Sequence, residues 1–236
     1  MGQALVRAIA EREDLKLGGI WVRDVRQVSN LDLNPDTLVS TNIHDVAAAA
    51  DVLIDFSLPE ATANVVAAVG DAGIPLVIGV SGLADVELQL IAAAARSVPV
   101  VYDRNMSMGV AVLESLVRQA AASLGEDFAV EVQETHHIHK LDSPSGTALK
   151  LGEAIAEARG TDAADIRYKV ERRGEVPGDH SVTFSSATEV LTFGHSVTTR
   201  QVFADGALRA ARWALLQPPG QYAMRDVLGK KTTDSL

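Results

Sequence analysis

Apolar residues in the first half of the chain follow two alternating spacings. Residues 1–13 carry apolar side chains at helical spacing with charges between them, which predicts an amphipathic helix. Short, nearly continuous apolar runs, typical of strands buried on both faces, follow at 16–22, 51–57, 74–82 and 98–105. Helix-like segments separate these runs, at 44–50, 59–73 and 85–97. The alternation predicts an α/β fold with a doubly wound parallel sheet, an architecture typical of nucleotide-binding domains.

The pattern changes after residue 104. Two amphipathic helices, 110–124 and 146–160, flank a strand-like segment at 128–135. Short runs of Thr, Val, Ser and Phe between 179 and 203 predict an open antiparallel sheet, and a last helix at 207–217 leads into a polar tail. We therefore expect an inserted α+β domain. The predicted nucleotide-binding domain comprises residues 1–106 plus 204–236, and the predicted substrate-binding and oligomerisation domain comprises residues 107–203.

Composition and charge narrow the choice of partner. The 236-residue chain is 47% hydrophobic and 22% charged, which is the balance of a globular protein. Its formal net charge of -10 argues against nucleic acid or an anionic membrane as the main partner. Cysteine is absent, which excludes disulfides and thiolate chemistry. No apolar run approaches the roughly 18 residues that span a bilayer, so we expect a cytoplasmic protein that acts on a small molecule.

The segment from Glu134 to Ala148 concentrates side chains that can carry chemistry. Three histidines and Lys140 stand here against an acidic background, followed by Gly146 and Thr147 at a predicted helix start. Backbone N–H groups at a helix start bind anions, and a histidine can deliver a proton near neutral pH. The combination indicates a pocket for a substrate that bears carboxylates.

Two other interpretations of this segment remain open. Three clustered histidines can bind zinc, although the HHIH run lacks the spacing of a metalloprotease helix and no cysteine assists it. The cluster is also compatible with a solvated strand end that precedes an ordinary helix start. We expect no metal.

The same segment resembles a known enzyme family. It matches the signature E-x-H-H-x-x-K-x-D-x-P-S-G-T-A of the 4-hydroxy-tetrahydrodipicolinate reductases, also called dihydrodipicolinate reductases. Other landmarks agree in order along nearly the whole chain: IDFS, GVSG at 79–82, the NMSMG run at 105–109, His195, Arg200, FADGA and MRDVLG. The resemblance implies a Rossmann-type doubly wound sheet and a reductase of the diaminopimelate route to lysine. NADH or NADPH would reduce a cyclic, dicarboxylated imine to tetrahydrodipicolinate.

The resemblance also implies roles for individual residues. His136 would be the proton donor, and Lys140 would hold or polarise the substrate. His137, Gly146 and Thr147 would bind the substrate carboxylates, and the enzyme would be a homotetramer.

The resemblance also implies that five further residues bind the cofactor. Gly79 and Ser81 would lie beneath the nicotinamide ribose, and Asn105 and Met106 would support the nicotinamide. Arg23 follows a predicted strand at the place where such folds read the adenine ribose, and an arginine there favours a 2′-phosphate. Each position also has an ordinary interpretation, as a turn, a domain hinge or a surface arginine.

The chain departs from the family at its start. The family opens with a strand and a G-x-x-G-[RK]-M-G turn that cradles the pyrophosphate, whereas this sequence opens at Met1-Gly2, the end of that pattern. We expect that the first strand of the sheet is missing, that Met1 is a mis-assigned start or a truncation, and that the working protein carries roughly 15 more residues, about one strand and a turn. The alternative is a truncated, catalytically weak or silent nucleotide-binding relative. The segment between Gly160 and Asp179 also looks shorter than is usual in the family.

Overall fold

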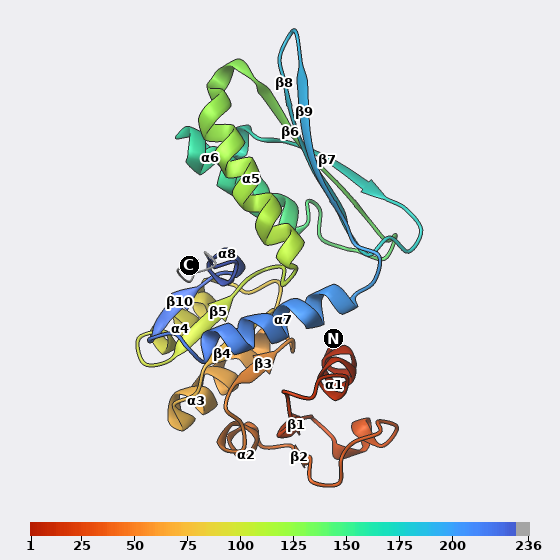
Figure 1. The fold of residues 1–236 in the computed structure, drawn as a ribbon, viewed down its shortest axis with the longest axis vertical. Coiled ribbons are helices and arrows are strands. Elements are labelled where there is room, and N and C mark those ends of the chain that lie inside the picture. Colours follow the sequence, from red (N-terminus) through yellow and green to blue (C-terminus); the bar gives the residue numbers. More distant parts are fainter. Residues whose placement is uncertain (230–236) are drawn as a thin grey trace, which may run out of the picture. The chain divides into compact units, whose positions relative to one another are not determined.

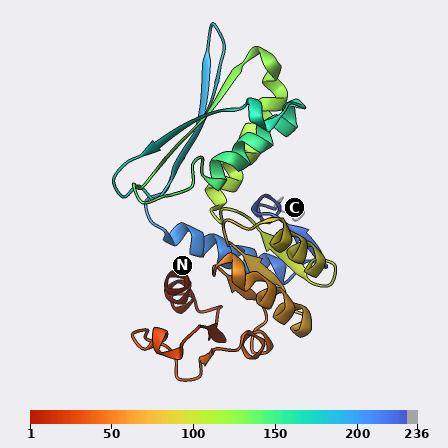
Figure 2. The ribbon, with the colours of Figure 1, turned by 180° about the vertical axis from the view of Figure 1, so that it is seen from behind.

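The computed structural model describes residues 1–229, which form two compact units (Figures 1 and 2). The first unit combines Met1–Met106 with Phe203–Val227, and the second contains Ser107–Val202. The chain therefore leaves the first unit after Met106 and returns to it at Phe203. The last seven positions of the predicted first domain, 230–236, lie outside the described residues. No helix among the described residues is long and apolar enough to cross a membrane.

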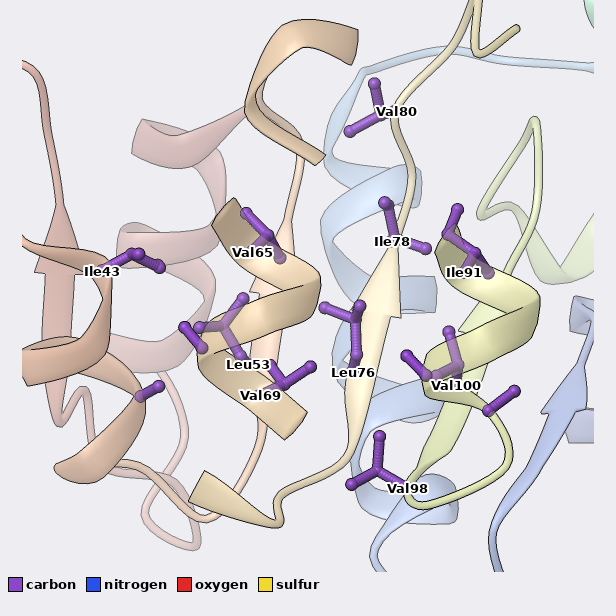
Figure 3. Close-up of a cluster of buried hydrophobic side chains, with 14 residues drawn as sticks. Ile43, Leu53, Val65, Val69, Leu76, Ile78, Val80, Ile91, Val98 and Val100 are labelled. Atoms are coloured by element: carbon purple, nitrogen blue, oxygen red, sulfur yellow. The ribbon is translucent and has the colours of Figure 1, made fainter. Parts of the chain in front are cut away.

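The main sheet of the first unit is fully parallel. Its strands are β3 (Leu53–Asp55), β4 (Leu76–Ile78), β5 (Pro99–Tyr102) and β10 (Gly220–Tyr222), in the order β10-β5-β4-β3. Helices α3 (Thr62–Ala72) and α4 (Asp85–Ala94) cover one face, and α7 (Gln201–Ala214) lies over the other (Figures 1 and 2). Side chains of α3, α4 and the strands meet in one buried cluster that includes Val65, Leu76 and Ile91 (Figure 3). The two-sided burial explains the continuous apolar runs in the sequence.

A second, two-stranded parallel sheet pairs β1 (Gly19–Trp21) with β2 (Leu38–Ser40). It follows α1 (Gly2–Ala10), whose C-terminal end is joined to α7 by ion pairs between Arg12 and Asp205 and between Asp14 and Arg212. In the described chain no strand precedes α1, and β1 is not hydrogen-bonded to β3. Residues of β1 and β3 instead line one largely apolar groove of about 630 Å³, together with parts of α1 and α7. Among the described residues, the β1–β2 pair and the four-stranded parallel sheet are therefore two separate sheets.

The second unit is a four-stranded sheet with two helices on one face. The sheet order is β7-β6-β8-β9, from β6 (Ala129–His136), β7 (Arg167–Arg172), β8 (Asp179–Ser185) and β9 (Val190–Ser196). β6 pairs in parallel with β7, whereas the β6–β8 and β8–β9 pairs are antiparallel. Helices α5 (Met108–Leu124) and α6 (Gly146–Arg159) bury Val132, Leu151 and Phe184 against the sheet. This unit is the α+β part of the predicted fold.

Several elements differ from the sequence prediction. β2 and β7 were not predicted, and the short segment between Gly160 and Asp179 contains β7. Their three- and six-residue stretches are only half-buried or exposed, so neither carries a continuous apolar signal. The tail predicted to be polar contains β10 and α8 (Met224–Val227), and α7 begins at Gln201, six residues earlier than the predicted last helix.

Candidate active site

The chemistry-bearing segment begins on β6. Side chains on a strand alternate between the two faces, so Glu134 and His136 lie on the same face of the sheet as the core residue Val132. Both are buried, with 1% and 7% of their surface exposed. Nδ1 of His136 lies 3.0 Å from Oε2 of Glu134. The predicted proton donor is therefore held by a buried carboxylate on its own strand.

The other oxygen of Glu134 reaches the start of α6. Its Oε1 accepts the backbone N–H of Ser145 at 3.0 Å and the guanidinium of Arg172 at 3.2 and 3.3 Å. Burial alone acts to raise the pKa of Glu134, but the contacts with His136 and Ser145 outweigh it and lower that pKa to about 2. Glu134 is therefore ionised at neutral pH.

Helix α6 opens at the predicted anion site. Ser145 is its N-cap, with Oγ accepting the N–H of Ala148 at 3.2 Å. Gly146 and Thr147 form the first turn, where the N–H groups and the helix dipole favour a negatively charged ligand. The backbone positions to which the sequence analysis assigned carboxylate binding thus lie at the N-terminus of a 14-residue helix.

The loop between β6 and α6 carries the other two predicted substrate residues. Nζ of Lys140 lies 2.7 Å from Oδ1 of Asp142. His137 follows β6, and its Nε2 lies 3.5 Å from a guanidinium nitrogen of Arg200. Slight burial and the positive charge of Arg200 lower the pKa of His137, so its neutral form is favoured.

His180 on β8 completes the buried cluster. Its ring is edge-on to that of His136, with centroids 5.1 Å apart, and its Nε2 lies 3.3 Å from Oγ of Ser145. Burial, reinforced by the charge of His136, lowers the pKa of His180 to about 3, so it is neutral at physiological pH.

A zinc site formed by three neighbouring histidines was one interpretation of the sequence. The three neighbouring histidines of the sequence do not converge on one point, since His139 is exposed and lies beside Glu175. Glu134, His136 and His180 instead offer ligand atoms within 4.8 Å of one another. The Arg172 guanidinium already binds the Glu134 carboxylate, which opposes a further cation there. The arrangement has the character of a hydrogen-bonded, charge-paired network around His136.

The predicted cofactor residues follow the carboxyl ends of parallel strands in the first unit. Arg23 is exposed after β1, Gly79 and Ser81 follow β4, and Asn105 and Met106 follow β5. In open α/β sheets, ligands bind in the crevice at these carboxyl ends.

Local packing fixes the turns after β4 and β5. A Cβ on Gly79 would approach the Phe56 ring to 2.5 Å, so only glycine fits this turn without a shift. Asp103 accepts the N–H of Asn105 at 3.2 Å and the N–H of Met224 at 3.0 Å, which ties the loop after β5 to α8.

Two family models cover the chain almost completely. The model of the N-terminal part of dihydrodipicolinate reductase matches residues 1–106, and the model of its C-terminal part matches residues 109–228. The chain belongs to the dihydrodipicolinate reductase family. This confirms three expectations that the resemblance implied: the family itself, the Rossmann-type fold and the class of NAD(P)H-dependent reductase.

Curated relatives and solved structures agree with the family. The chain is 41% identical to the 4-hydroxy-tetrahydrodipicolinate reductase of Wolinella succinogenes and 37% identical to that of Pseudoalteromonas translucida, and the alignments cover 97% and 98% of this chain and 95% of each relative. A dipicolinate-bound dihydrodipicolinate reductase from Paenisporosarcina has the same fold, with a TM-score of 0.78 at 21% identity over 94% of this chain and 92% of that one. The relatives' shared name favours the reductase over the alternative of a silent nucleotide-binding protein.

Sequence reasoning missed three residues of the site network. Glu134 stands in the signature, two positions before His136, but received no role. Arg172 and His180 stand in no motif, and they reach the site because β7 and β8 flank β6, with His136 opposite Arg172 and Glu134 opposite His180. Alternation along β8 places His180 on the core side with Val182, which is the one signal that was available.

Proposed function

We propose that this reductase transfers hydride from NADPH or NADH to 4-hydroxy-tetrahydrodipicolinate, giving tetrahydrodipicolinate for lysine biosynthesis through diaminopimelate. One observation carries the proposal: Glu134 and Arg172 form a single network that holds three parts of the site in place. Glu134 contacts His136 and the start of α6, and Arg172 binds both Glu134 and the loop of Lys140. A dicarboxylated ring requires an acid and anion-binding groups close together, and this network provides them.

Two features of the loop and α6 suit the substrate carboxylates. The N-terminus of α6 at Gly146 and Thr147 offers backbone donors to one carboxylate. Lys140 and His137 offer a charged and a neutral group to the other. Lys140 then exchanges its partner Asp142 for the substrate, and its charge-assisted bond strengthens when water is excluded.

His136 acts as the general acid in this proposal. Reduction of a conjugated imine leaves an electron-rich atom that must be protonated, and an imidazolium supplies a proton near neutral pH. Oε2 of Glu134 lies 3.0 Å from Nδ1 of the ring, so Nε2 is the nitrogen that gives up the proton.

The nicotinamide cofactor supplies the hydride when it is bound. Gly79 and Ser81 would hold its nicotinamide ribose, and Asn105 and Met106 would support the nicotinamide ring. The exposed guanidinium of Arg23 after β1 favours the 2′-phosphate of NADPH, although NADH also remains a candidate.

We also propose a cytoplasmic homotetramer assembled through the sheet of the second unit. Its helix-free face carries polar side chains around a cavity of about 360 Å³, and β9 exposes Val190 and Leu191. Exposed apolar side chains on an edge strand favour coverage by another copy. Sedimentation velocity measures the mass directly.

A coupled assay tests the activity. The upstream synthase generates the unstable substrate in place, and the loss of nicotinamide absorbance is followed with NADPH and with NADH. The proposal expects oxidation that depends on the synthase, and Lys140→Ala serves as the low-activity control. Cofactor oxidation that is equal with and without the synthase would contradict it.

A further inference from the structure

The carboxylate of Glu134 contacts four residues of the proposed substrate site in the second unit: His136, His180, Ser145 and Arg172. Its Oε2 faces Nδ1 of His136 at 3.0 Å and Nε2 of His180 at 4.0 Å. Oε2 of Glu134 and Nδ1 of His136 are buried, and neither has a hydrogen-bond partner elsewhere in the described part of the chain. A hydrogen bond from Nδ1 of His136 to Oε2 of Glu134 is therefore the arrangement that satisfies both atoms.

The other oxygen of Glu134 contacts the start of α6. Oε1 accepts the N–H of Ser145, the N-cap of α6, at 3.0 Å. The position of the first turn of α6 is thereby tied to the strand that carries His136. A substrate held at that turn would have a fixed distance to the acid.

Arg172 extends this control to the loop of Lys140. Its guanidinium binds Glu134 and also donates to the backbone carbonyls of Lys140 at 3.4 Å and Asp142 at 2.5 Å. It lies opposite His136 in the β6–β7 register. Arg172 thus neutralises the buried carboxylate and fixes the backbone from which the Lys140 side chain extends.

The surroundings of His136 leave Nε2 as the nitrogen that can react with the substrate. Nε2 of His136 faces Gly178, where an added Cβ would lie 3.0 Å from that nitrogen. Gly178 has φ of +151°, so a larger residue would meet both a strained backbone and this ring. With Nδ1 directed at Glu134, the proton on Nε2 is the one that can be transferred.

We propose that Glu134 is a positioning residue, which holds His136 with Nδ1 protonated and Nε2 presented to substrate and, through Ser145 and Arg172, fixes α6 and the Lys140 loop around it. The proposal rests on the proposed function, because it assigns His136 the role of acid. It makes Glu134 act through His136 and leaves the chemistry to that residue. Carboxylates that orient a catalytic imidazole in this way fix its tautomer and stabilise its charged form.

The first test reads the His136 tautomer in the ligand-free enzyme. Histidine is labelled with ¹⁵N, and the His136 signals are assigned by their loss in His136→Gln. The proposal expects the neutral ring to carry its proton on Nδ1. A neutral ring protonated on Nε2 would overturn the proposal, whatever the enzyme's activity.

The second test uses Glu134→Gln and a pH–rate profile. The charged and titratable groups around His136 are Glu134 on β6, Arg172 on β7, His180 on β8, and His137 and Lys140 in the loop. An acid must be protonated, so activity falls as the pH rises through its pKa. Without the carboxylate the imidazolium loses its stabilisation, so this fall should move to lower pH, with kcat reduced roughly 10- to 100-fold and nucleotide affinity unchanged.

Two variants make the profile specific. Glu134→Asp keeps the charge and should restore the wild-type position of the alkaline fall while kcat stays below wild type. Glu171→Gln makes the same chemical change one residue from Arg172, at a carboxylate that accepts from Thr135 instead, and should leave the profile unchanged. An unshifted profile in Glu134→Gln would overturn the positioning role. A wild-type enzyme that shows the Nδ1 tautomer but does not use the substrate would refute the proposed function alone.

Discussion

Nζ of Lys140 lies 2.7 Å from the carboxylate of Asp142. Partial burial acts to raise the pKa of Asp142, but the bond to Lys140 outweighs it and lowers that pKa, so the ionised carboxylate is favoured. A dianionic substrate that binds Lys140, as proposed above, must therefore compete with Asp142 for the same ammonium group.

Lys140→Ala should impair both substrate binding and turnover. Loss of one charge-assisted hydrogen bond costs about 1.5–3 kcal/mol, which corresponds to roughly a 10- to 100-fold loss in kcat/KM. Steady-state kinetics with varied substrate measure the loss. His139→Ala, a change at the exposed ring in the same loop, should have almost no effect. Equal losses in both variants would show that the loop is sensitive to any truncation and that Lys140 has no special role.

Asp142→Asn should make the substrate bind more tightly. The substitution removes the negative charge that occupies Lys140 while keeping the size of the side chain, so the substrate no longer displaces an ion pair. KM should fall with kcat nearly constant. A rise in KM would indicate instead that Asp142 positions Lys140 for the substrate.

His136→Gln should lower turnover and leave nucleotide binding intact. General acid catalysis contributes typically about 10²–10⁴-fold, and His136 lies in the second unit whereas the proposed nucleotide residues lie in the first. Stopped-flow single-turnover rates and nucleotide titrations separate the two effects. A loss of nucleotide affinity as large as the loss of rate would place His136 in the wrong role.

Pyridine-2,6-dicarboxylate should inhibit competitively against substrate. It is a planar dianion whose carboxylates match the α6 start and the His137–Lys140 side of the proposed pocket. Its inhibition constant should rise in Lys140→Ala by about the factor found for the substrate. Competition with the nucleotide alone would contradict this placement.

The free energy of unfolding should fall as soon as the pH drops below neutrality. Burial, reinforced by His136, lowers the pKa of His180 from 6.5 to about 3, so between these values the unfolded chain binds more protons than the folded one. His180 then contributes a slope of up to about 1.4 kcal/mol per pH unit, with stability lost as the pH falls.

Urea unfolding from about pH 7.5 to 4.5 measures this slope. His180→Gln should flatten it even if the variant is less stable overall. His139→Gln, where the side chain is 71% exposed, should leave it unchanged. An equal slope in the wild type and His180→Gln would show that other groups control the acid sensitivity.

Elements buried on both faces were predictable from the sequence. All three residues of β4 are fully buried, so its apolar run is continuous and separates clearly from the flanking helices. β7 was not predictable, because its sequence RYKVER alternates charged and apolar residues at a half-exposed sheet edge. It becomes a strand by pairing with β6, more than thirty residues earlier in the chain.

The site divides in the same way. His136, Lys140 and the α6 start are neighbours in sequence, so one motif reveals them together. Arg172 and His180 join the site only through strand register, opposite His136 and Glu134 respectively. Spacing within the sequence carries no information about such cross-strand pairs.

Transfer of isotope from the cofactor to the product tests the central claim most directly. The enzyme is given NADPH with deuterium at the transferable C4 position of the nicotinamide, together with synthase-generated substrate, and the product is examined by mass spectrometry and NMR. The account predicts one deuterium at C4 of tetrahydrodipicolinate, formed in step with NADP⁺. Product without deuterium from either C4-labelled form of NADPH, or cofactor oxidised with no reduced product, would contradict it.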